Sequence, residues 1–323
     1  MRIERLRGNP IIRPHMDARM GTNINGPSLI RVPHWIDAPL GTNYLYFADH
    51  KGHYIRLAYA DRLEGPWRTY EPGTLQLEQS CFLTTPPEIP AELQPHLADM
   101  AKQRAGMVGV ESPIENATAV HIASPDAHVI DESREVRLYY HGLEGCRYQV
   151  SRVATSKDGL HFQAAPEILA QSYLRLFYHQ SWYYGIAMPG IFYRSKDGLT
   201  GFEPGPTLFN SNMRHAGLLL RGDQLYVFWS QVGDIPERIL LSTIDLRPDW
   251  MTWQASAPIE ALRPEYPWEG SHEPLAPSIR GAIKVPVNQL RDPAIFEEDG
   301  RVFLLYTVAG ESGIAIAEVV LDA

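Results

Sequence analysis

Residues 54–67 read YIRLAYADRLEGPW, and this stretch decides the fold because variants of it recur along the chain. Each copy is an alternating apolar strand, then a polar turn containing Asp with Gly or Pro, then an aromatic residue. The other copies are SRVATSKDGLHF (151–162), IFYRSKDGLTGF (191–202) and RILLSTIDLRPDW (238–250). Repetition of a four-strand unit is the sequence signature of a β-propeller.

Two further strand-like runs precede each copy, rich in Val, Ile, Leu, Tyr and Phe and bounded by Gly, Asp and Asn turns. In the first unit these runs are PSLIRVP and NYLYFAD. A fifth unit contains PAIFEEDG and VFLLYTVAG, followed by GIAIAEVVL. The five units predict an all-β fold, a five-bladed β-propeller with four-stranded blades that forms a single domain over residues 1–323.

The fifth unit has only three clear strands, so we expect an N-terminal strand near residues 9–13 to close the ring and remove its free edges. Helical periodicity is almost absent. The exception is PAELQPHLADMAKQRAG (90–106), which predicts one short helix within an insertion at about 72–112, between blades 1 and 2. Long insertions are usually functional, so this one either covers the central funnel or bridges to a second subunit in a homo-oligomer.

The composition is that of an ordinary soluble globular protein, with 44% hydrophobic and 21% charged residues. A formal charge of −9 argues against a nucleic-acid partner or an anionic membrane surface. Cys81 and Cys146 are too few for a disulfide framework. The N-terminus lacks the apolar segment of a secretory signal, and no apolar run approaches a membrane span, so we expect a cytoplasmic location without a membrane partner.

In a propeller, the residues before each first strand and in each turn between the second and third strands crowd one mouth of the central funnel. In this chain those positions combine carboxylates with imidazoles and guanidinium groups, which displace one another's pKa values as acid/base chemistry requires. The candidate catalytic residues are Asp49, Asp126, Asp292 and Glu311, and the candidate substrate-binding residues are His50, His128, His141, Arg175, Arg214, His215, Glu237 and Arg291.

These residues also have structural interpretations, which remain open at this point. Asp126 in Ser-Pro-Asp is typical of an Asx turn. The turn that contains Asp49 and His50 is consistent with an ordinary solvated turn, and so is the turn that contains Glu311. Arg214 is consistent with an arginine that has only a structural role. Four further aspartates recur at the same place in successive units, and a catalytic group is needed only once. We therefore interpret them as turn residues: Asp61, Asp158, Asp197 and Asp245.

The opening Leu290-Arg-Asp-Pro293, which leads into AIFEEDGRVFLLYT, resembles the blade openings of the five-bladed propeller glycosidases. These are the arabinanases, β-xylosidases, fructosidases and their relatives. The first unit, from NGPSLIRVP to IRLAYADRLEGPW, is similar to their first blade. The resemblance implies a glycoside hydrolase without a required cofactor, and it favours a small oligosaccharide or glycoside of furanose type as the substrate. By position, Asp126 and Asp292 match the blade-opening aspartates of the family.

The resemblance also implies a base or nucleophile at the first blade opening, a second carboxylate that orients or stabilises, and a Glu acid from the third blade. The chain departs from this pattern, because its first opening is Asn25-Gly26-Pro27 and its third offers Tyr173 and Arg175. We therefore assign the base to Asp49 and the acid to Glu311 or Glu237. His215 or His50 is an alternative acid, since imidazole donates protons well near neutral pH.

Three other functions remain open besides hydrolysis. A glycoside phosphorylase would bind phosphate through Arg175, Arg214, His215 and Arg291. A sugar lyase would use Asp or His as its base. A non-catalytic sugar-binding propeller would repeat its binding residues in each blade, whereas the residues at this mouth differ from blade to blade, which favours an enzyme.

Twelve histidines raise the question of metal binding, but none has HxxxH or HxH spacing. The metal site that remains open is one structural cation on the propeller axis, Ca²⁺ or Na⁺, held partly by His128 or His215. The sequence contains no glycine-rich phosphate-binding loop. Aromatic residues concentrate in the third to fifth units, and we expect one or two of them to contact a sugar. They are Tyr173, Phe177, Tyr178, Trp182, Tyr183, Tyr184, Trp229 and Trp268.

Overall fold

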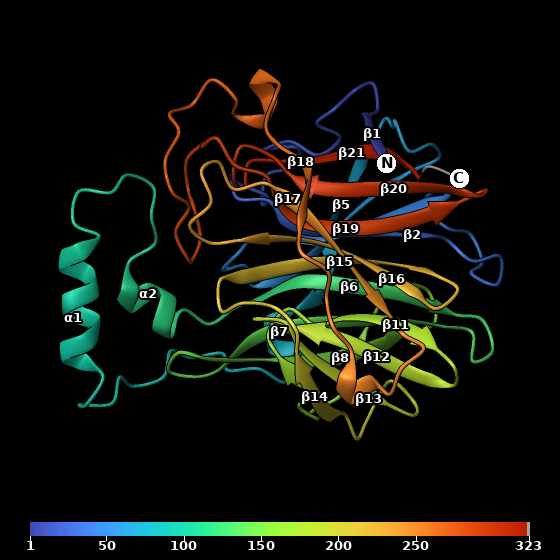
Figure 1. Ribbon diagram of the computed structural model, residues 1–323, viewed down its shortest axis with the longest axis horizontal. Coiled ribbons are helices and arrows are strands. Elements are labelled where there is room, and N and C mark those ends of the chain that lie inside the picture. Colours follow the sequence, from blue (N-terminus) through green and yellow to red (C-terminus); the bar gives the residue numbers. More distant parts are fainter. Residues whose placement is uncertain (322–323) are drawn as a thin grey trace.

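The computed structural model describes residues 1–321 and contains five antiparallel sheets arranged as the blades of a propeller (Figure 1). The strands of blade 1 are β2 (Asn25–Arg31), β3 (Asn43–Ala48), β4 (Tyr54–Ala60) and β5 (Arg68–Gln76). Those of blade 2 are β6 (Ile122–Ile130), β7 (Glu135–Gly145), β8 (Tyr148–Ser156), and two short outer strands, β9 (Gln163–Ala164) and β10 (Ala170–Gln171).

The strands of blade 3 are β11 (Arg175–His179), β12 (Trp182–Ala187), β13 (Ile191–Ser195) and β14 (Glu203–Thr207). Those of blade 4 are β15 (Met213–Arg221), β16 (Gln224–Gln231), β17 (Ile239–Asp245) and β18 (Ile259–Leu262). Those of blade 5 are β19 (Arg291–Glu298), β20 (Arg301–Thr307), β21 (Ile314–Val320) and β1 (Arg2–Arg5). The predicted all-β, five-bladed propeller with four-stranded blades is confirmed.

The ring is closed by an N-terminal strand, as predicted, but at a different place. Strand β1 pairs with β21, with Arg2 opposite Val320 and Arg5 opposite Ala317. The expected segment 9–13 contributes only an isolated bridge between Ile12 and Ile314. Pro10 has no backbone N–H and cannot continue a ladder, which explains why the closing strand lies earlier in the chain.

The core of the described residues consists of apolar clusters that each lie between two neighbouring blades. For example, Phe192 and Trp229 belong to the cluster between blades 3 and 4, and both are almost fully buried. Burying one such side chain contributes about 1.5–3 kcal/mol. Because each strand face packs against the next blade, the interfaces hold the inner strands in fixed positions around the axis.

The repeated Asp residues stabilise the turns that follow the third strands. The Asp158 carboxylate accepts hydrogen bonds from the backbone N–H groups of Leu160 and His161, both at 2.8 Å. Asp197 accepts in the same way from Leu199 and Thr200, again at 2.8 Å. These contacts agree with the structural interpretation of the repeated aspartates.

The insertion between blades 1 and 2 contains two helices where the sequence predicted one. Helices α1 (Gln94–Gln103) and α2 (Pro113–Thr118) stand to one side of the blades, at the left in Figure 1. Ser112 caps α2 by accepting a hydrogen bond from the Glu115 N–H at 3.0 Å. Short 3₁₀ turns occur at Leu77–Gln79, Trp250–Thr252 and Pro267–Glu269.

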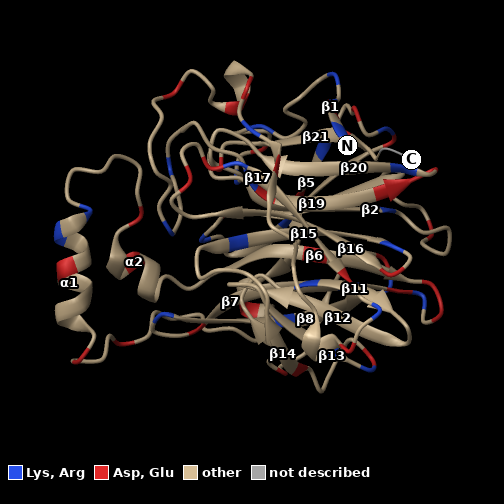
Figure 2. Cartoon of the chain, viewed as in Figure 1, with Lys and Arg blue, Asp and Glu red and all other residues tan. Residues whose placement is uncertain are grey.

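Basic and acidic residues are interspersed along the chain and do not separate into large single-sign regions of the ribbon (Figure 2). Among residues 1–321, no helix is both long enough and apolar enough to span a membrane.

Candidate functional site

A cavity of about 310 Å³ lies where loops of several blades meet, and we call it the mouth cavity. His50 reaches it from the turn between β3 and β4, Tyr173 from the segment before β11, and His215 from β15. The other residues that line it are Asn116, Arg147, Tyr148, Gln149, Gln171, Ser172, Met188, Pro189, Arg214, Arg280 and Gly281. No Asp or Glu within residues 1–321 is part of this wall.

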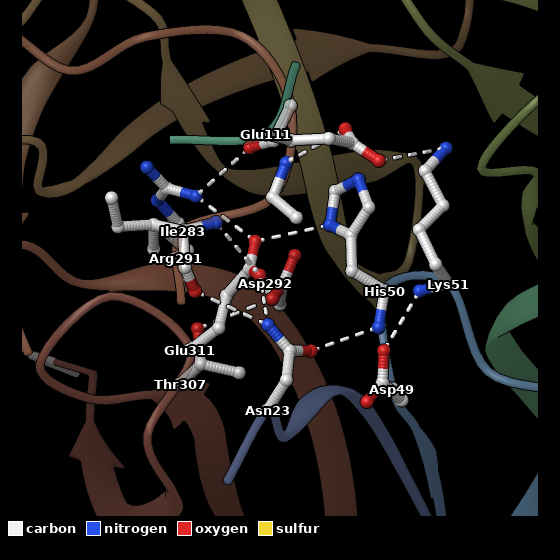
Figure 3. Close-up of polar contacts among 12 residues, drawn as sticks. Asn23, Asp49, His50, Lys51, Glu111, Ile283, Arg291, Asp292, Thr307 and Glu311 are labelled. Carbon is white, nitrogen blue, oxygen red and sulfur yellow. Dashed lines mark hydrogen bonds and ion pairs between the residues drawn. The ribbon is translucent and has the colours of Figure 1, made fainter. Parts of the chain in front are cut away.

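Two imidazole groups on this wall are each backed by a buried carboxylate. His215 Nδ1 is in close contact with Asp292 Oδ1, and Asp292 Oδ2 accepts a hydrogen bond from Thr307 Oγ1 at 3.2 Å. His50 Nδ1 lies 3.1 Å from Glu311 Oε1, a contact drawn in Figure 3. Asp292 and Glu311 are each only 1% exposed. Each carboxylate therefore fixes the orientation of its imidazole without facing the cavity itself.

The electrostatic surroundings separate the protonation states within these pairs. Burial is the largest influence on Asp292 and opposes its ionisation, but the charge and hydrogen bond of His215 together with the charge of Arg214 lower the pKa of the carboxyl overall. Burial lowers the pKa of His215 and outweighs the opposing effect of Asp292. Burial also opposes ionisation of Glu311, yet His50 and Arg291 hold its pKa well below the usual range. At neutral pH both carboxyls are thus ionised and His215 is neutral.

An ion-pair network links Arg214 on the cavity wall to Glu237 and Arg291 behind it, and all three are predicted site residues. Arg291 donates to Glu311 Oε1 at 2.9 Å and lies 3.4 Å from Glu237 Oε2. Arg214 donates to the same Glu237 oxygen at 3.2 Å, and Ser230 Oγ donates to Glu237 Oε1 at 2.9 Å. Glu237 is fully buried, so its oxygens serve to hold the two arginines.

His141 is also at this site, although the cavity wall does not include it. Its ring lies 4.1 Å, centroid to centroid, from the ring of Tyr173, which in turn lies 4.3 Å from that of His215. Neither ring nitrogen of His141 has a hydrogen-bond partner among the described residues. Burial, with smaller effects from His121, keeps the pKa of His141 well below normal, and burial raises the pKa of Tyr173.

Asp49 lies beside the cavity and not on its wall. Its side chain is 32% exposed, accepts a hydrogen bond from the Lys51 N–H at 2.9 Å, and has one oxygen 3.6 Å from Arg56. Figure 3 shows Asp49 next to His50 and Asn23. Asp49, predicted as the base, therefore lies next in the chain to His50, which lines the mouth cavity, but is not itself part of the wall.

The structure separates Asp126, His128 and Arg175 from the other predicted site residues. They line a different cavity of about 370 Å³, which shares no lining residue with the mouth cavity. Asp126 Oδ2 contacts His128 Nε2 at 2.8 Å and accepts a hydrogen bond from the Leu176 N–H at 2.9 Å. Arg175 lies 3.4 Å from Asp126 Oδ1. The polar groups of these three side chains thus contact one another at a place away from the mouth cavity.

A shared β-bulge explains this separation. In blade 5 the bulge lies between Arg291 and Ala294, and Asp292 within it has a φ of 48°. In blade 2 the bulge lies between Ala123 and Asp126, and Ser124 within it has a φ of 50°. Ser124 therefore takes the position of Asp292, and the match of Asp126 to a blade-opening aspartate by position has to be corrected.

Blade 1 carries a glycine at the equivalent position. Gly26, within the bulge between Asn25 and Ser28, has a φ of 59°. A Cβ atom at Gly26 would lie 2.7 Å from the Cα of Ser124, so a side chain cannot fit without movement of the backbone. Among the three bulges of blades 1, 2 and 5, only blade 5 holds a carboxylate, that of Asp292.

Three further polar residues at the site were missed by sequence reasoning. Asn23 accepts from the His50 N–H at 2.8 Å and donates to Glu311 Oε2 at 2.7 Å. Lys51 Nζ lies 3.8 Å from Glu111 Oε1, and burial lowers the pKa of Lys51 (Figure 3). Asn23 and Lys51 adjoin positions that the blade pattern selects, whereas Glu111 belongs to the insertion and carries no such signal.

The described part of the chain contains no group of three or more His, Cys, Asp or Glu side chains that could hold a metal ion. The two histidines considered for a structural cation, His128 and His215, each use one ring nitrogen to contact an aspartate.

Solved structures with the same fold include glycoside hydrolases. A GH43 β-xylosidase/α-arabinofuranosidase from a compost microbial metagenome is 13% identical, with a TM-score of 0.57 over 98% of this chain and 96% of that one. An exo-1,5-α-L-arabinanase from a bovine ruminal metagenomic library is 13% identical, with a TM-score of 0.54 over 93% and 94% of the two chains. At such identities the similarity shows the fold of the GH43 propellers.

No protein-family model matches the chain. The sequence is, however, 37% identical over 319 residues to "Uncharacterized protein R118" of Acanthamoeba polyphaga mimivirus, covering 91% of this chain and 82% of that protein. Identity at this level over nearly the full length shows common membership, and the chain belongs to the same protein family as this mimivirus protein.

Proposed function

We propose that the protein is an enzyme that hydrolyses a glycosidic bond of a small carbohydrate in the mouth cavity. The observation that carries this proposal is that His215 and His50 line one cavity, each with a buried carboxylate behind it. An imidazole oriented in this way is a typical general acid or base. The fold of the GH43 enzymes supports the reaction class by analogy.

In this proposal His215 is the base. Its Nδ1 is directed to Asp292, so Nε2 of the neutral ring is the nitrogen that takes a proton from water. The water oxygen attacks the anomeric carbon, the bond from that carbon to the leaving oxygen breaks, and His50 gives a proton to the leaving oxygen. A proton then passes from His215 to His50 through solvent, which restores both groups.

These roles differ from the carboxylate roles that the sequence suggested. The four contacts of Glu311, with His50, Arg291, Asn23 and the Ile283 N–H, engage both of its oxygens. We therefore assign Glu311 and Asp292 to positioning the two imidazoles. A preference for furanose sugars remains part of the proposal and rests on the resemblance to arabinanases.

Phosphorolysis is the second candidate reaction. It is favoured by three arginines on the wall of the same cavity, Arg147, Arg214 and Arg280. Guanidinium groups bind phosphate well, and a bound phosphate would replace water as the nucleophile.

The test is a panel of aryl furanosides and pyranosides with arabinan, fructan and xylan oligomers, assayed with and without phosphate. We expect sugar release from the substrate without a need for phosphate. We also expect kcat/KM to fall by about 10²–10⁴-fold in His215→Gln and in His50→Gln. His161→Gln is the matched control, since its imidazole contacts Asp158 at 2.7 Å on the surface. Full activity in both site variants would contradict the proposal, and strict phosphate dependence would favour phosphorolysis.

A further inference from the structure

We propose that Arg147, Arg214 and Arg280 form a binding site for a compact oxyanion, a carboxylate or phosphate group, at the mouth cavity. The inference rests on the proposed function, because it names the substrate class of that same site. The anion is carried either by the sugar itself, as in a uronate or a sugar phosphate, or by free inorganic phosphate.

Arg280 provides the first argument, because its guanidinium lacks a counter-ion. It donates to the Ser211 carbonyl at 2.9 Å and contacts Met188 Sδ at 3.3 Å, and within residues 1–321 no carboxylate forms an ion pair with it. The residue is partly buried, and burial together with repulsion from Arg214 lowers its pKa. A desolvated charge is costly unless an opposite charge pairs with it, so the geometry favours an anion beside Arg280.

The ion pairs behind the cavity wall do not use all the hydrogen-bond donors of Arg214, so some remain for a ligand. Glu237 contacts both Arg214 and Arg291, so one carboxylate is shared by two guanidinium groups. The remaining contacts of Arg214 are long, at 3.4 Å to the carbonyls of Ile279 and Gly281. Arg214 therefore retains donor capacity toward the cavity that it lines.

The composition of the wall provides the second argument. Arg147 is exposed on the cavity wall and takes part in no ion pair among the described residues. The uncharged polar neighbours, Gln149 and Gln171, add amide donors, and no carboxylate in residues 1–321 is part of the wall to repel an anion. The whole chain carries a net charge of −9, so this local excess of positive charge is not a consequence of a generally basic surface. Concave sites of one sign concentrate ligands of the opposite sign.

Direct binding measurements test the inference independently of catalysis. Isothermal titration of the intact protein with inorganic phosphate, glucuronate and the neutral analogue glucose gives the three affinities. We expect at least one anionic probe to bind more tightly than glucose, and its Kd to rise by at least about tenfold in Arg280→Gln and in Arg147→Gln. Arg147 is exposed, so the second variant avoids a folding defect. Arg301→Gln, which removes an exposed ion pair with Glu318, is the control.

The outcomes separate the two sources of the anion. Phosphate binding together with phosphate-dependent sugar release identifies free phosphate, whereas glucuronate binding in preference to glucose identifies an anionic sugar. Failure of both anions to bind, or binding that neither arginine substitution weakens, overturns the inference. If the anion binds as expected and no glycoside is cleaved, the oxyanion site stands and the proposed hydrolysis fails.

Discussion

Single residues at the mouth differ in how completely their polar atoms are engaged. Glu311 has contacts on both oxygens, including Arg291 at 2.9 Å and Asn23 at 2.7 Å, and it is 1% exposed. His215, in contrast, has one nitrogen directed to Asp292 and lines the cavity. Fully engaged groups stabilise the site, and partly engaged groups are the ones available to a substrate.

We predict that Glu311→Gln lowers the free energy of unfolding by about 3–5 kcal/mol at pH 7, because it removes the charge that pairs with buried Arg291. The pKa of Glu311 is lowered on folding, so its contribution is present above the unfolded pKa of about 4.3 and is lost as pH falls. The difference in the free energy of unfolding between wild type and variant therefore becomes smaller below about pH 4.

Urea unfolding at pH 7 and at lower pH measures this difference. Glu318→Gln, which removes the exposed pair with Arg301, is the control and should change stability by about 1 kcal/mol at most. A Glu311→Gln variant as stable as wild type at pH 7 would show that the buried network does not stabilise the fold.

At the scale of strands and loops, register determines which of the candidate residues reach the mouth. The sequence places most of them there: Asp49, His50, His141, Arg214, His215, Glu237, Arg291, Asp292 and Glu311. It misplaces Asp126 because the blade-2 bulge puts Ser124, two residues earlier, at the position that Asp292 occupies in blade 5. A single sequence does not specify such a bulge.

The insertion is the other element that sequence reasoning could not resolve. Glu111 comes from it and accepts a hydrogen bond from Asn116 at 2.5 Å, and Asn116 itself lines the mouth cavity. The insertion lies outside the repeated blade pattern, so no periodicity indicates where its polar residues lie. Its contact with the site depends on packing between segments distant in sequence.

The Asp turns after the third strands allow an element-scale prediction. Burial opposes ionisation of Asp158, but hydrogen bonds from His161 and the backbone outweigh it and lower its pKa to about 2. We expect Asp158→Ala to lower the free energy of unfolding by about 1–2 kcal/mol at pH 7 through loss of these hydrogen bonds. The lowered pKa means that this stabilisation is complete above pH of about 4 and is lost as pH falls through about 2.

Urea unfolding of wild type and Asp158→Ala at pH 7 and pH 3 checks both statements, with Asp158→Asn as the variant that retains one acceptor oxygen. If the difference in the free energy of unfolding between wild type and Asp158→Ala were larger at pH 3 than at pH 7, the assigned direction of the pKa shift would be wrong.

At the scale of the whole molecule, the repeated strand pattern was sufficient to predict five blades and closure by the N-terminus. The exact closing strand was not predictable, because segment 9–13 is more apolar than Arg2–Arg5. Closure by β1 also depends on a side chain from a distant loop. Arg5 Nε contacts Glu269 Oε1 at 2.7 Å, and Glu269 is fully buried.

We predict that Arg5→Ala destabilises the propeller by about 3–5 kcal/mol, because it leaves the Glu269 carboxylate buried without its guanidinium partner. Arg2→Ala is the matched control on the same strand, since Arg2 pairs with exposed Glu4 and should contribute about 1 kcal/mol at most. Free energies of unfolding from urea titration compare the two. Equal effects would show that the Arg5 pair does not secure the closing strand.

The most direct test of the central claim compares kcat/KM of Asp292→Asn with that of Asp126→Asn on the substrate that the glycoside panel identifies. Both aspartates match the blade-opening pattern in sequence, but only Asp292 contacts an imidazole on the wall of the mouth cavity. We predict a loss of about 10²-fold or more in Asp292→Asn and near wild-type activity in Asp126→Asn. Loss of activity in Asp126→Asn, with Asp292→Asn unaffected, would contradict the assignment of the active site to the mouth cavity.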